Sequence, residues 1–480
     1  MKEAMDLLTH VRRKKLIGLT AALGLLLLAA AYHVPPVAGS DLAQENPVYI
    51  VQQGDTLNSI ALRFGITSEE IQSANGIADP NALAIGQRLI IPGLEGISGV
   101  LTSERIPFGT TLQSLTRQYQ LDQADLAFLN RITSPSETIA GVKFIIPVNE
   151  GRNPLSPIAS VGTDETLLEA AIKTGTSPWN LLNENQLAGT WDIIPGEILF
   201  ASLDEEVAQT PLPGMNGIWF NNLPVVQGET LQIGLSSGTQ AAYSGNFRGS
   251  SFEFFTQNDQ DYYSFIGIHA LAEPGIFPLR ITTTFPDGRQ QSFDQPVLLV
   301  EGGYGSEWVS VSEDYLDQEA IEEEDAYLAS IFQQSTPEKY WDGQFKYPVD
   351  EPCINSSFGQ RRDYNNGSLF FYHTGIDFAV CAQNLNVYAP AAGRIVVAEE
   401  LFVKGKAIII DHGWGVYSGY WHLSEFNASV GDFVEPGDLI GYIGNTGRSA
   451  GPHLHFEIDI AGVPVNPKPW LDQTFPQSEP

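Results

Sequence analysis

The amino-acid sequence predicts a multidomain chain. We expect small α/β repeats first, then an all-β sandwich, and last a domain of strands and tight turns. Three observations lead to this prediction. The chain has 480 residues, against roughly 100–200 for one domain. Its first part repeats with a period of 55 residues. Further along, turn residues separate short runs of alternating polarity.

Composition excludes several classes of protein. Hydrophobic residues make up 43% of the chain and charged residues 17%, so wholesale disorder is excluded. The net charge of −32 argues against nucleic acid as a partner and against a polybasic membrane-surface protein, because both require clustered Lys and Arg. Two cysteines exclude a disulfide-rich scaffold and a four-cysteine zinc site.

Residues 1–40 have the form of an export signal. Basic residues at 12–15 precede an apolar run, Leu16–Tyr32, interrupted only by Thr20. The run is long for a signal-peptide core and short for a membrane span of ~20 residues. Its basic flank is expected to stay inside, which places the rest of the chain in the cell wall, at the cell surface or in the periplasm. We therefore expect a cleaved signal peptide or a transmembrane signal anchor as the only link to a membrane; a buried core helix is the alternative.

Three repeats follow, at residues 47–93, 103–148 and 158–203. In the first, Tyr49–Val51 predicts a strand, and Asp55 or Thr56 predicts the N-cap of a short helix. A second short helix and a final strand complete a strand–helix–helix–strand unit. Residues in register across the repeats are Leu57, Leu112 and Leu167, then Asn75, Asn130 and Asn185, and then Gly86, Gly141 and Gly196.

These repeats resemble LysM modules. The resemblance rests on Val51–Leu57, on Asn75-Gly76 and on Gly86–Pro92 of the first repeat; the second repeat matches moderately and the third is degenerate. It implies binding to N-acetylglucosamine-containing glycans such as peptidoglycan or chitin. Repeats two and three can instead be spacers that have lost the ligand groove. The candidate glycan-binding residues are Gly54, Asp55, Thr56 and Asn75.

The middle of the chain, residues 213–302, predicts an immunoglobulin-like β sandwich. Around seven short alternating runs lie between turn signals such as Pro286-Asp287-Gly288. We expect a spacer or an accessory binding domain, in which His269 is structural.

An acidic helical linker is expected at residues 303–344. A rough apolar stripe runs through residues 313–333. The four acidic residues 322–325 are interpreted as a solvated face. In the alternative, this helix packs against the next domain and limits access to its cleft.

Histidines concentrate at the C-terminal end. Five of the eight follow residue 370, among β-branched, aromatic and glycine residues that favour strands and tight turns. Because side chains two apart on a strand share a face, His453 and His455 can point into one site. A catalytic zinc takes three protein ligands and leaves a fourth position for water, and imidazole and carboxylate both suit it. On residue types alone, any three of these can be the ligands: His373, Asp377, His422, His453 and His455.

The segment Phe345–Leu471 resembles the lysostaphin/LytM-like zinc endopeptidases of the duplicated hybrid motif fold. It covers about a quarter of the chain, and one small departure is Ala450, where many relatives carry Thr. The matching stretches are Ser357–Arg361, His373–Phe378, Ala389–Gly393, Ile409–Gly413, Trp421–Ser424, Gly444–Ser449 and Gly451–Glu457.

This resemblance implies a mainly antiparallel β peptidase domain at residues 345–472. One Zn²⁺ per chain is implied, with His373, Asp377 and His455 as ligands. His422 and His453 are implied as the catalytic pair. Because an imidazole has a pKa near neutrality, either of them can accept the proton of the attacking water and help hold the developing oxyanion. Regulatory members of the family usually lack some of these five residues, and none is missing here.

Cys353 and Cys381 lie 28 residues apart in the same segment. Outside the cytoplasm a disulfide between them is expected. The alternatives are zinc ligation and two buried thiols.

Together these features predict an exported murein hydrolase. Its zinc endopeptidase domain is expected to cut peptide stems or cross-bridges of peptidoglycan, while the LysM-like repeats hold the chain on glycan. One alternative is a non-catalytic cell-wall binding protein or an activator of another murein hydrolase; another is a zinc peptidase acting on proteins. The bond that is cut, the oligomeric state and self-inhibition by residues 313–333 stay open.

Overall fold

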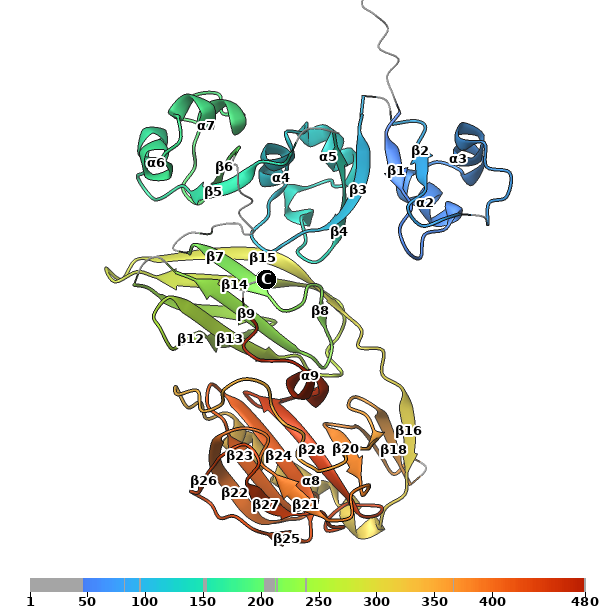
Figure 1. The fold of residues 1–480 in the computed structure, drawn as a ribbon, viewed down its shortest axis with the longest axis vertical. Coiled ribbons are helices and arrows are strands. Elements are labelled where there is room, and N and C mark those ends of the chain that lie inside the picture. The colour runs from blue at the N-terminus through green and yellow to red at the C-terminus, as the bar shows by residue number, and fades with distance from the viewer. Residues whose placement is uncertain are drawn as a thin grey trace, which may run out of the picture. The chain divides into compact units, whose positions relative to one another are not determined.

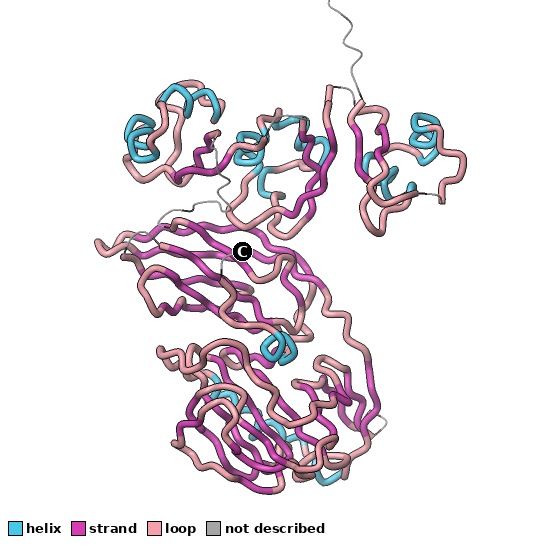
Figure 2. Tube along the Cα trace, in the orientation of Figure 1, coloured by secondary structure: helices cyan, strands magenta, loops and turns pink. Residues whose placement is uncertain are grey.

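The computed structural model describes residues 46–81, 83–94, 96–149, 153–202, 212, 215–237, 240–365 and 367–478. The predicted export segment lies outside these residues. No helix within the described ranges is long and apolar enough to cross a membrane. The chain forms two compact units, one ending at Leu101 and one beginning at Thr102. Strands dominate and helices are few and short, so the prediction of a largely β, multidomain chain is confirmed (Figures 1 and 2).

The first repeat has the expected order strand–helix–helix–strand. Thr56 caps the first helix: its hydroxyl accepts a hydrogen bond from the Ser59 amide, and the Ser59 hydroxyl accepts one from the Thr56 amide. The two strands pair antiparallel, with Tyr49 opposite Leu89. The elements are β1 (Val48–Ile50), α2 (Leu57–Phe64), α3 (Ser68–Asn75) and β2 (Arg88–Ile90).

The asparagine shared by the repeats has a structural role. Asn75 donates to the carbonyls of Ile71 and Ile90 and accepts from the Ile90 amide, so its side chain ties the second helix to the last strand. Asn130 and Asn185 make the same three bonds in their own repeats. This explains why an amide side chain recurs with the period of the repeat.

Repeats two and three have the same two helices, and the first helix of each is capped by a threonine, Thr111 or Thr166. Each buries a small core of its own, around Leu126 in the second and Leu181 in the third. The elements of the second are β3 (Val100–Arg105), α4 (Leu112–Tyr119), α5 (Gln123–Asn130), η1 (Pro135–Glu137) and β4 (Lys143–Val148). Those of the third are β5 (Ser156–Ser160), α6 (Leu167–Thr174), α7 (Pro178–Glu184) and β6 (Ile198–Ala201).

The middle of the chain is a pair of mainly antiparallel sheets, ordered β11-β10-β14-β15-β8 and β12-β13-β9-β7. Alternate residues of both sheets, such as Ile233 and Ile281, meet in one apolar core. The strands are β7 (Gly217–Phe220), β8 (Val225–Val226), β9 (Thr230–Ser236), β10 (Ala242–Phe247), β11 (Ser250–Glu253), β12 (Phe255–Thr256), β13 (Asp261–Gly267), β14 (Gly275–Thr284) and β15 (Gln290–Val300).

The C-terminal part is built on one large sheet, in the order β17-β20-β28-β24-β23-β22-β26, with β29 beside β28 (Figure 1). Its elements are β16 (Ser306–Val309), η2 (Glu313–Leu316), α8 (Gln318–Phe332), β17 (Ile354–Ser356), β18 (Arg361–Tyr364), β19 (Leu369–Tyr372), β20 (Ile376–Ala379), β21 (Asn386–Tyr388), β22 (Gly393–Leu401), β23 (Gly405–Asp411), β24 (Val416–Leu423), β25 (Glu425–Phe426), β26 (Phe433–Val434), β27 (Leu439–Tyr442), β28 (His453–Ile460), β29 (Val463–Val465) and α9 (Pro467–Asp472).

The residues expected to form a linker belong to this C-terminal part: β16 joins a small separate sheet, β16-β18-β19, and α8 packs onto the large sheet. Strand β16 pairs in parallel with β18. Helix α8 covers the outer face of β23 and β24, where Leu328 and Phe332 meet Ile409 and Tyr417. Because the other face of the same strands packs into the main core, both faces of β23 are buried. That explains its unbroken apolar run.

One part of the linker prediction is wrong. Glu324 does not belong to a solvated face: it is 7% exposed and accepts hydrogen bonds from the amides of Val403 and Lys404. It lies three residues after buried Ile321 and four before buried Leu328, on the helix face that packs against the sheet.

Candidate metal centre

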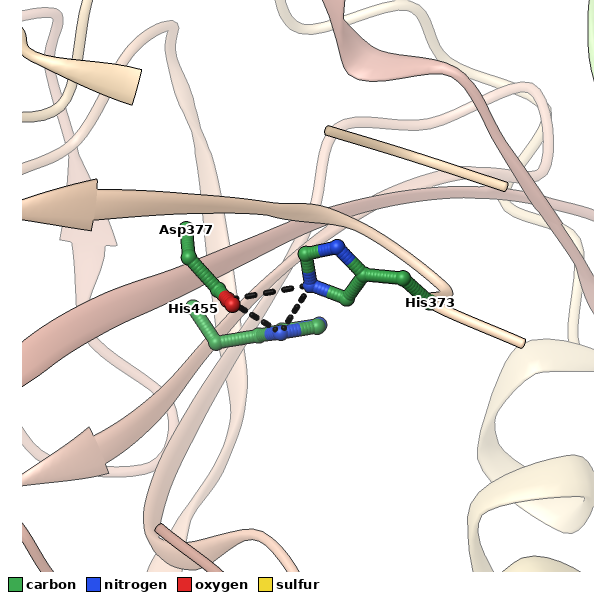
Figure 3. Close-up of side chains that lie close together, drawn as sticks. All are labelled: His373, Asp377 and His455. Carbon is green, nitrogen blue, oxygen red and sulfur yellow. Dashed lines mark hydrogen bonds and ion pairs between the residues drawn. The ribbon is translucent and has the colours of Figure 1, made fainter. Parts of the chain in front are cut away.

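Strand register brings the predicted ligands together. In the antiparallel pair β20 and β28, Asp377 lies directly opposite His455. Their neighbours Phe378, Leu454 and Phe456 point to the other face and are buried in the core. His373 lies just before β20, and its ring points at the same spot (Figure 3).

Three ligand atoms converge in this buried group. His373 Nε2 lies 3.0 Å from Asp377 Oδ1 and 2.9 Å from His455 Nδ1, and His455 Nδ1 lies 2.8 Å from Asp377 Oδ1 (Figure 3). One ligand atom from each residue lies within 4.8 Å of the others. The structure thus assembles the three residues that the resemblance implied as ligands.

Hydrogen bonds on the far side of each imidazole decide which nitrogen carries a lone pair. His373 Nδ1 lies 2.8 Å from the Ser357 carbonyl, and His455 Nε2 lies 2.8 Å from Glu457 Oε1. A carbonyl and a carboxylate only accept, so these two nitrogens bear the hydrogens. The nitrogens that face Asp377 therefore present lone pairs.

Two imidazole lone pairs and a carboxylate oxygen in contact repel one another unless a cation lies between them. The donor set therefore fits a divalent metal with nitrogen and oxygen ligands, and zinc is the ion that such a set favours. Burial lowers the pKa of His373 to about 4, which keeps its ring neutral and able to coordinate. Burial opposes ionisation of Glu457, but Lys404 and His455 hold its pKa below the ordinary value, so it stays an acceptor.

A second layer of hydrogen bonds orients the carboxylate. Arg362 Nη2 donates to Asp377 Oδ2 at 2.7 Å, which leaves Oδ1 free to face the imidazoles. The Nε of the same guanidinium donates to Glu307 at 2.5 Å, and Glu307 also accepts from the Ser356 hydroxyl. Such outer partners fix the orientation of metal ligands.

The implied catalytic pair stands beside this group. His453 Nε2 lies 3.6 Å from Asp377 Oδ1, and the rings of His422 and His453 are 5.0 Å apart. The Nδ1 of His422 donates to the Thr446 carbonyl at 2.8 Å and that of His453 donates to the Gly451 carbonyl at 2.7 Å, so each Nε2 carries a lone pair. Burial lowers the pKa of both rings, most strongly that of His422, so both are neutral bases at pH 7.

His422 adopts a backbone conformation that non-glycine residues rarely adopt, with φ at 64°. Its amide is held by the Lys404 carbonyl at 2.8 Å. Strained residues of this kind cluster at functional sites. Nothing in the local sequence indicates this conformation, and the partner of the His422 amide lies in another loop.

A small cavity of about 40 Å³ opens onto the metal group. His373, His422 and His455 line it together with the basic side chains of Lys404 and Arg448. No role is predicted from the sequence for these two cations, nor for Arg362, Glu307 or Glu457. Arg448 and Glu457 lie in the stretches that carry the resemblance and Arg362 directly follows one of them, whereas Glu307 has no local signal at all.

The remaining sequence-predicted residues lie elsewhere. Cys353 and Cys381 form a disulfide that links the segment before β17 to the residues after β20. In the first repeat, Gly54, Asp55 and Thr56 form the turn before α2, and Asp55 accepts hydrogen bonds from Tyr49 and from the Gln52 amide. The fifth C-terminal histidine, His412, is buried and bonded to Ala392 and Ser418, away from the metal group.

Comparison with known proteins gives two family matches. Residues 371–467 match the model of peptidase family M23, and residues 49–92 match that of the LysM domain. The DD-carboxypeptidase/endopeptidase Mpg of Neisseria gonorrhoeae is 47% identical over 120 residues, which is 25% of this chain and 27% of that protein. The peptidoglycan DD-endopeptidase ShyA of Vibrio cholerae is 38% identical over 122 residues, 25% of this chain and 28% of that protein.

The murein hydrolase activator EnvC of Escherichia coli is 37% identical over 90 residues, covering 19% of this chain and 22% of EnvC. In all three cases the chain matches about a quarter of the relative's length or less. The expected resemblance to LytM-like peptidases and to LysM modules is confirmed.

Proposed function

Because this chain contains a domain of peptidase family M23 and a LysM domain, we propose that it is an exported, zinc-dependent peptidoglycan endopeptidase. The observation that carries the proposal is the convergence of His373, Asp377 and His455, with two neutral imidazoles next to them. The relatives named as DD-endopeptidases favour a peptide cross-link as the bond that is cut.

His373, Asp377 and His455 would hold one Zn²⁺ per chain. When bound, zinc supplies a Lewis acid that polarises a peptide carbonyl and brings the pKa of water at its open position towards ~7. His453 Nε2 accepts the proton of the attacking water, since its lone pair faces Asp377. His453 Nε2 would then pass this same proton to the leaving amine, and His422, whose ring lies 5.0 Å from that of His453, would be a second neutral base beside it. Arg448, which lines the same cavity, offsets negative charge that develops on the substrate.

The LysM-like repeats would hold the chain on the cell wall, and the β domain would separate them from the catalytic domain. Residues 47–93, 103–148 and 158–203 would be LysM-like repeats that bind glycan, and residues 213–302 would be an immunoglobulin-like spacer. Binding to glycan raises the local concentration of cleavable bonds without adding active-site contacts. Residues 1–40 would export the chain or anchor it at the outer face of a membrane.

Digestion of purified peptidoglycan sacculi tests this function. The chain without residues 1–40 is incubated with sacculi, with and without a chelator, and the released fragments are analysed by mass spectrometry. New amino termini within stem or bridge peptides, lost with chelator and restored by zinc, are expected. No release from a chain that binds one zinc would contradict the hydrolase function. It would favour the alternative that the chain activates another murein hydrolase, as the name of its relative EnvC describes.

A further inference from the structure

Arg448 is a cation without an acidic partner in the small cavity beside the metal ligands. Two further cations line the same cavity, and both are paired with carboxylates: Lys404 with Glu457 at 2.8 Å, and Arg362 with Asp377 at 2.7 Å. Among the described residues, none forms an ion pair with Arg448. Of the three cations, Arg448 is therefore the one whose charge is available to an anion that enters the cavity.

Aromatic rings and a backbone hydrogen bond hold this guanidinium in place. Its Cζ lies 4.8 Å from the centre of the Tyr364 ring and 6.0 Å from that of the Phe371 ring. The Arg448 amide donates to the Val403 carbonyl at 2.8 Å, which ties the loop before β28 to a neighbouring loop. Cation–π contacts orient a guanidinium over the faces of the rings and satisfy none of its N–H donors. The charge therefore has a defined position, which is what recognition of one substrate group requires.

The charge of Arg448 is also incompletely solvated. The side chain is partly exposed, but its Nη1 is buried and has no hydrogen-bond partner in the part of the chain that the structure describes. A guanidinium keeps its charge in a protein, so it cannot lower the cost of burial by losing a proton. Asp325 on α8 interacts electrostatically with Arg448 without forming an ion pair with it. An anion that reaches the exposed part of the guanidinium is thus bound more strongly than on an open surface.

The peptide bonds of peptidoglycan differ in whether a carboxylate stands next to the scissile nitrogen. In a cross-link to a diaminopimelate residue, the carbon that bears this nitrogen also bears a free carboxylate. A lysine side chain or a glycine bridge has no free carboxylate on that carbon. A stem that ends in D-alanyl-D-alanine has one, because the last alanine ends in it. A fixed cation beside the metal ligands can therefore distinguish these bonds.

We propose that Arg448 binds the carboxylate on the carbon next to the scissile nitrogen, and so selects peptide bonds whose leaving amine carries such a carboxylate. The proposal rests on the proposed function and names the substrate class of the same site. A planar guanidinium can hold a carboxylate by two parallel hydrogen bonds, which also orients the leaving group. Offsetting the charge that develops at the scissile carbonyl is a separate effect of the same cation, because that charge develops with every substrate.

The test uses the zinc-loaded chain without residues 1–40 and two soluble cross-linked muropeptide dimers. The carboxylate beside the cross-link is free in one dimer and amidated in the other. We expect kcat/KM of the wild type to be at least about tenfold higher for the free acid. Arg448→Gln should reduce this preference to about twofold or less, whereas loss of the effect on developing charge lowers kcat/KM equally for both dimers.

Two further variants make the result specific. Arg448→Lys keeps the charge and loses the planar pair of donors, so it should keep part of the preference. Arg394→Gln is the matched control, because Arg394 also packs over an aromatic ring, that of Phe433, but does not line the cavity. It should keep the full preference. Zinc content and thermal unfolding of each variant show that the site and the fold are intact.

The substrates separate the possible failures. Equal kcat/KM of the wild type for the two dimers, or a preference that survives Arg448→Gln, would overturn the carboxylate subsite while the endopeptidase function stands. The wild-type ratio gives the first of these answers even if Arg448→Gln does not fold. Cleavage of neither dimer by the zinc-loaded wild type would overturn the proposed function and the subsite with it.

A stem peptide that ends in D-alanyl-D-alanine distinguishes the two sources of the carboxylate. Release of the last alanine that falls with Arg448→Gln would extend the subsite to the terminal carboxylate. Cleavage of the free-acid dimer alone would confine the subsite to the cross-link.

Discussion

Glu307 and Asp377 share one guanidinium: Arg362 donates from Nε to Glu307 at 2.5 Å and from Nη2 to Asp377 at 2.7 Å. Glu307 also accepts from Ser356, whose hydroxyl lies 3.1 Å from His373 Nδ1. The Glu307 carboxylate on β16 therefore holds in place the hydrogen-bonding partners of two metal ligands, Asp377 and His373. Its position depends on the parallel pairing of β16 with β18, in which Glu307 lies opposite Arg362.

We therefore expect Glu307→Ala to weaken zinc binding by about 10- to 100-fold, the usual effect of losing an outer partner of a metal site. Loss of the carboxylate leaves Arg362 free to rotate away from Asp377. Competition against a chromophoric chelator measures the affinity. Glu313→Ala, at an exposed position of η2, is the control. Equal zinc affinity for Glu307→Ala and wild type would show that Arg362 stays beside Asp377 without help from Glu307.

Mutation should distinguish the metal ligand His455 from the general base His453. His455→Ala removes a ligand lone pair, so metal content and activity should fall together. His453→Ala should lower kcat by at least about 10²-fold while the chain keeps one zinc, because its Nε2 lies beside the ligand group without completing it. Metal analysis of the purified variants, run with the activity assay, distinguishes the two. If His453→Ala also loses zinc, His453 is a ligand.

Activity should persist below the pH at which free imidazole protonates. Burial lowers the pKa of His422 and of His453, so each base stays neutral at pH 6.5 and is lost only as the pH falls through its lowered pKa. We expect kcat/KM to stay level from pH 8 down through about 6.5, the ordinary imidazole pKa, and to fall only at a pH below it. Zinc content measured at each pH separates base protonation from metal loss. A decline that begins above pH 7 would contradict the burial argument.

Glu324 should stabilise the domain through the loop that carries Lys404. Glu324→Ala leaves the buried amides of Val403 and Lys404 without their acceptor, which should cost about 1–3 kcal/mol of unfolding free energy. Urea denaturation measures the loss. The neighbouring Glu323→Ala is a matched control, since Glu323 is exposed on the same helix. A similar loss in both variants would mean that the effect belongs to the helix and not to the loop.

Asp459 should make the fold less stable as the pH rises. Burial raises its pKa to about 8, so the native state holds a proton that the unfolded chain releases near pH 4. The contribution of protonated Asp459 to the unfolding free energy is fully present below pH 4 and is lost as the pH rises towards 8. Asp459→Asn keeps an acceptor for the Gly462 amide and removes the titration. We expect the variant to gain stability over wild type between pH 5 and 8, measured by thermal unfolding; a constant difference across this range would contradict a raised pKa.

Periodicity alone gave much of the architecture. The 55-residue register placed Asn75, Asn130 and Asn185 at equivalent positions, and each proves to tie a helix to the last strand of its repeat. The alternation that puts His453 and His455 on one face of their strand leaves Leu454 and Phe456 for the other face, and both are buried in the core. The burial of Glu324 could also be predicted, because its spacing from Ile321 and Leu328 places all three on one helix face. A run of four acidic residues outweighed that spacing and led to the wrong interpretation.

The sequence by itself determined which residues can do the chemistry, because residue types, strand alternation and family motifs are local properties of the chain. The sequence could not determine which residues hold these side chains in position. Glu307 reaches Arg362 only because two strands far apart in sequence pair in one register, and the lone pairs of His373 and His455 face inward only because Ser357 and Glu457 hold their other nitrogens. Pairing across such distances depends on the packing of the whole domain, and so tertiary structure alone decides it.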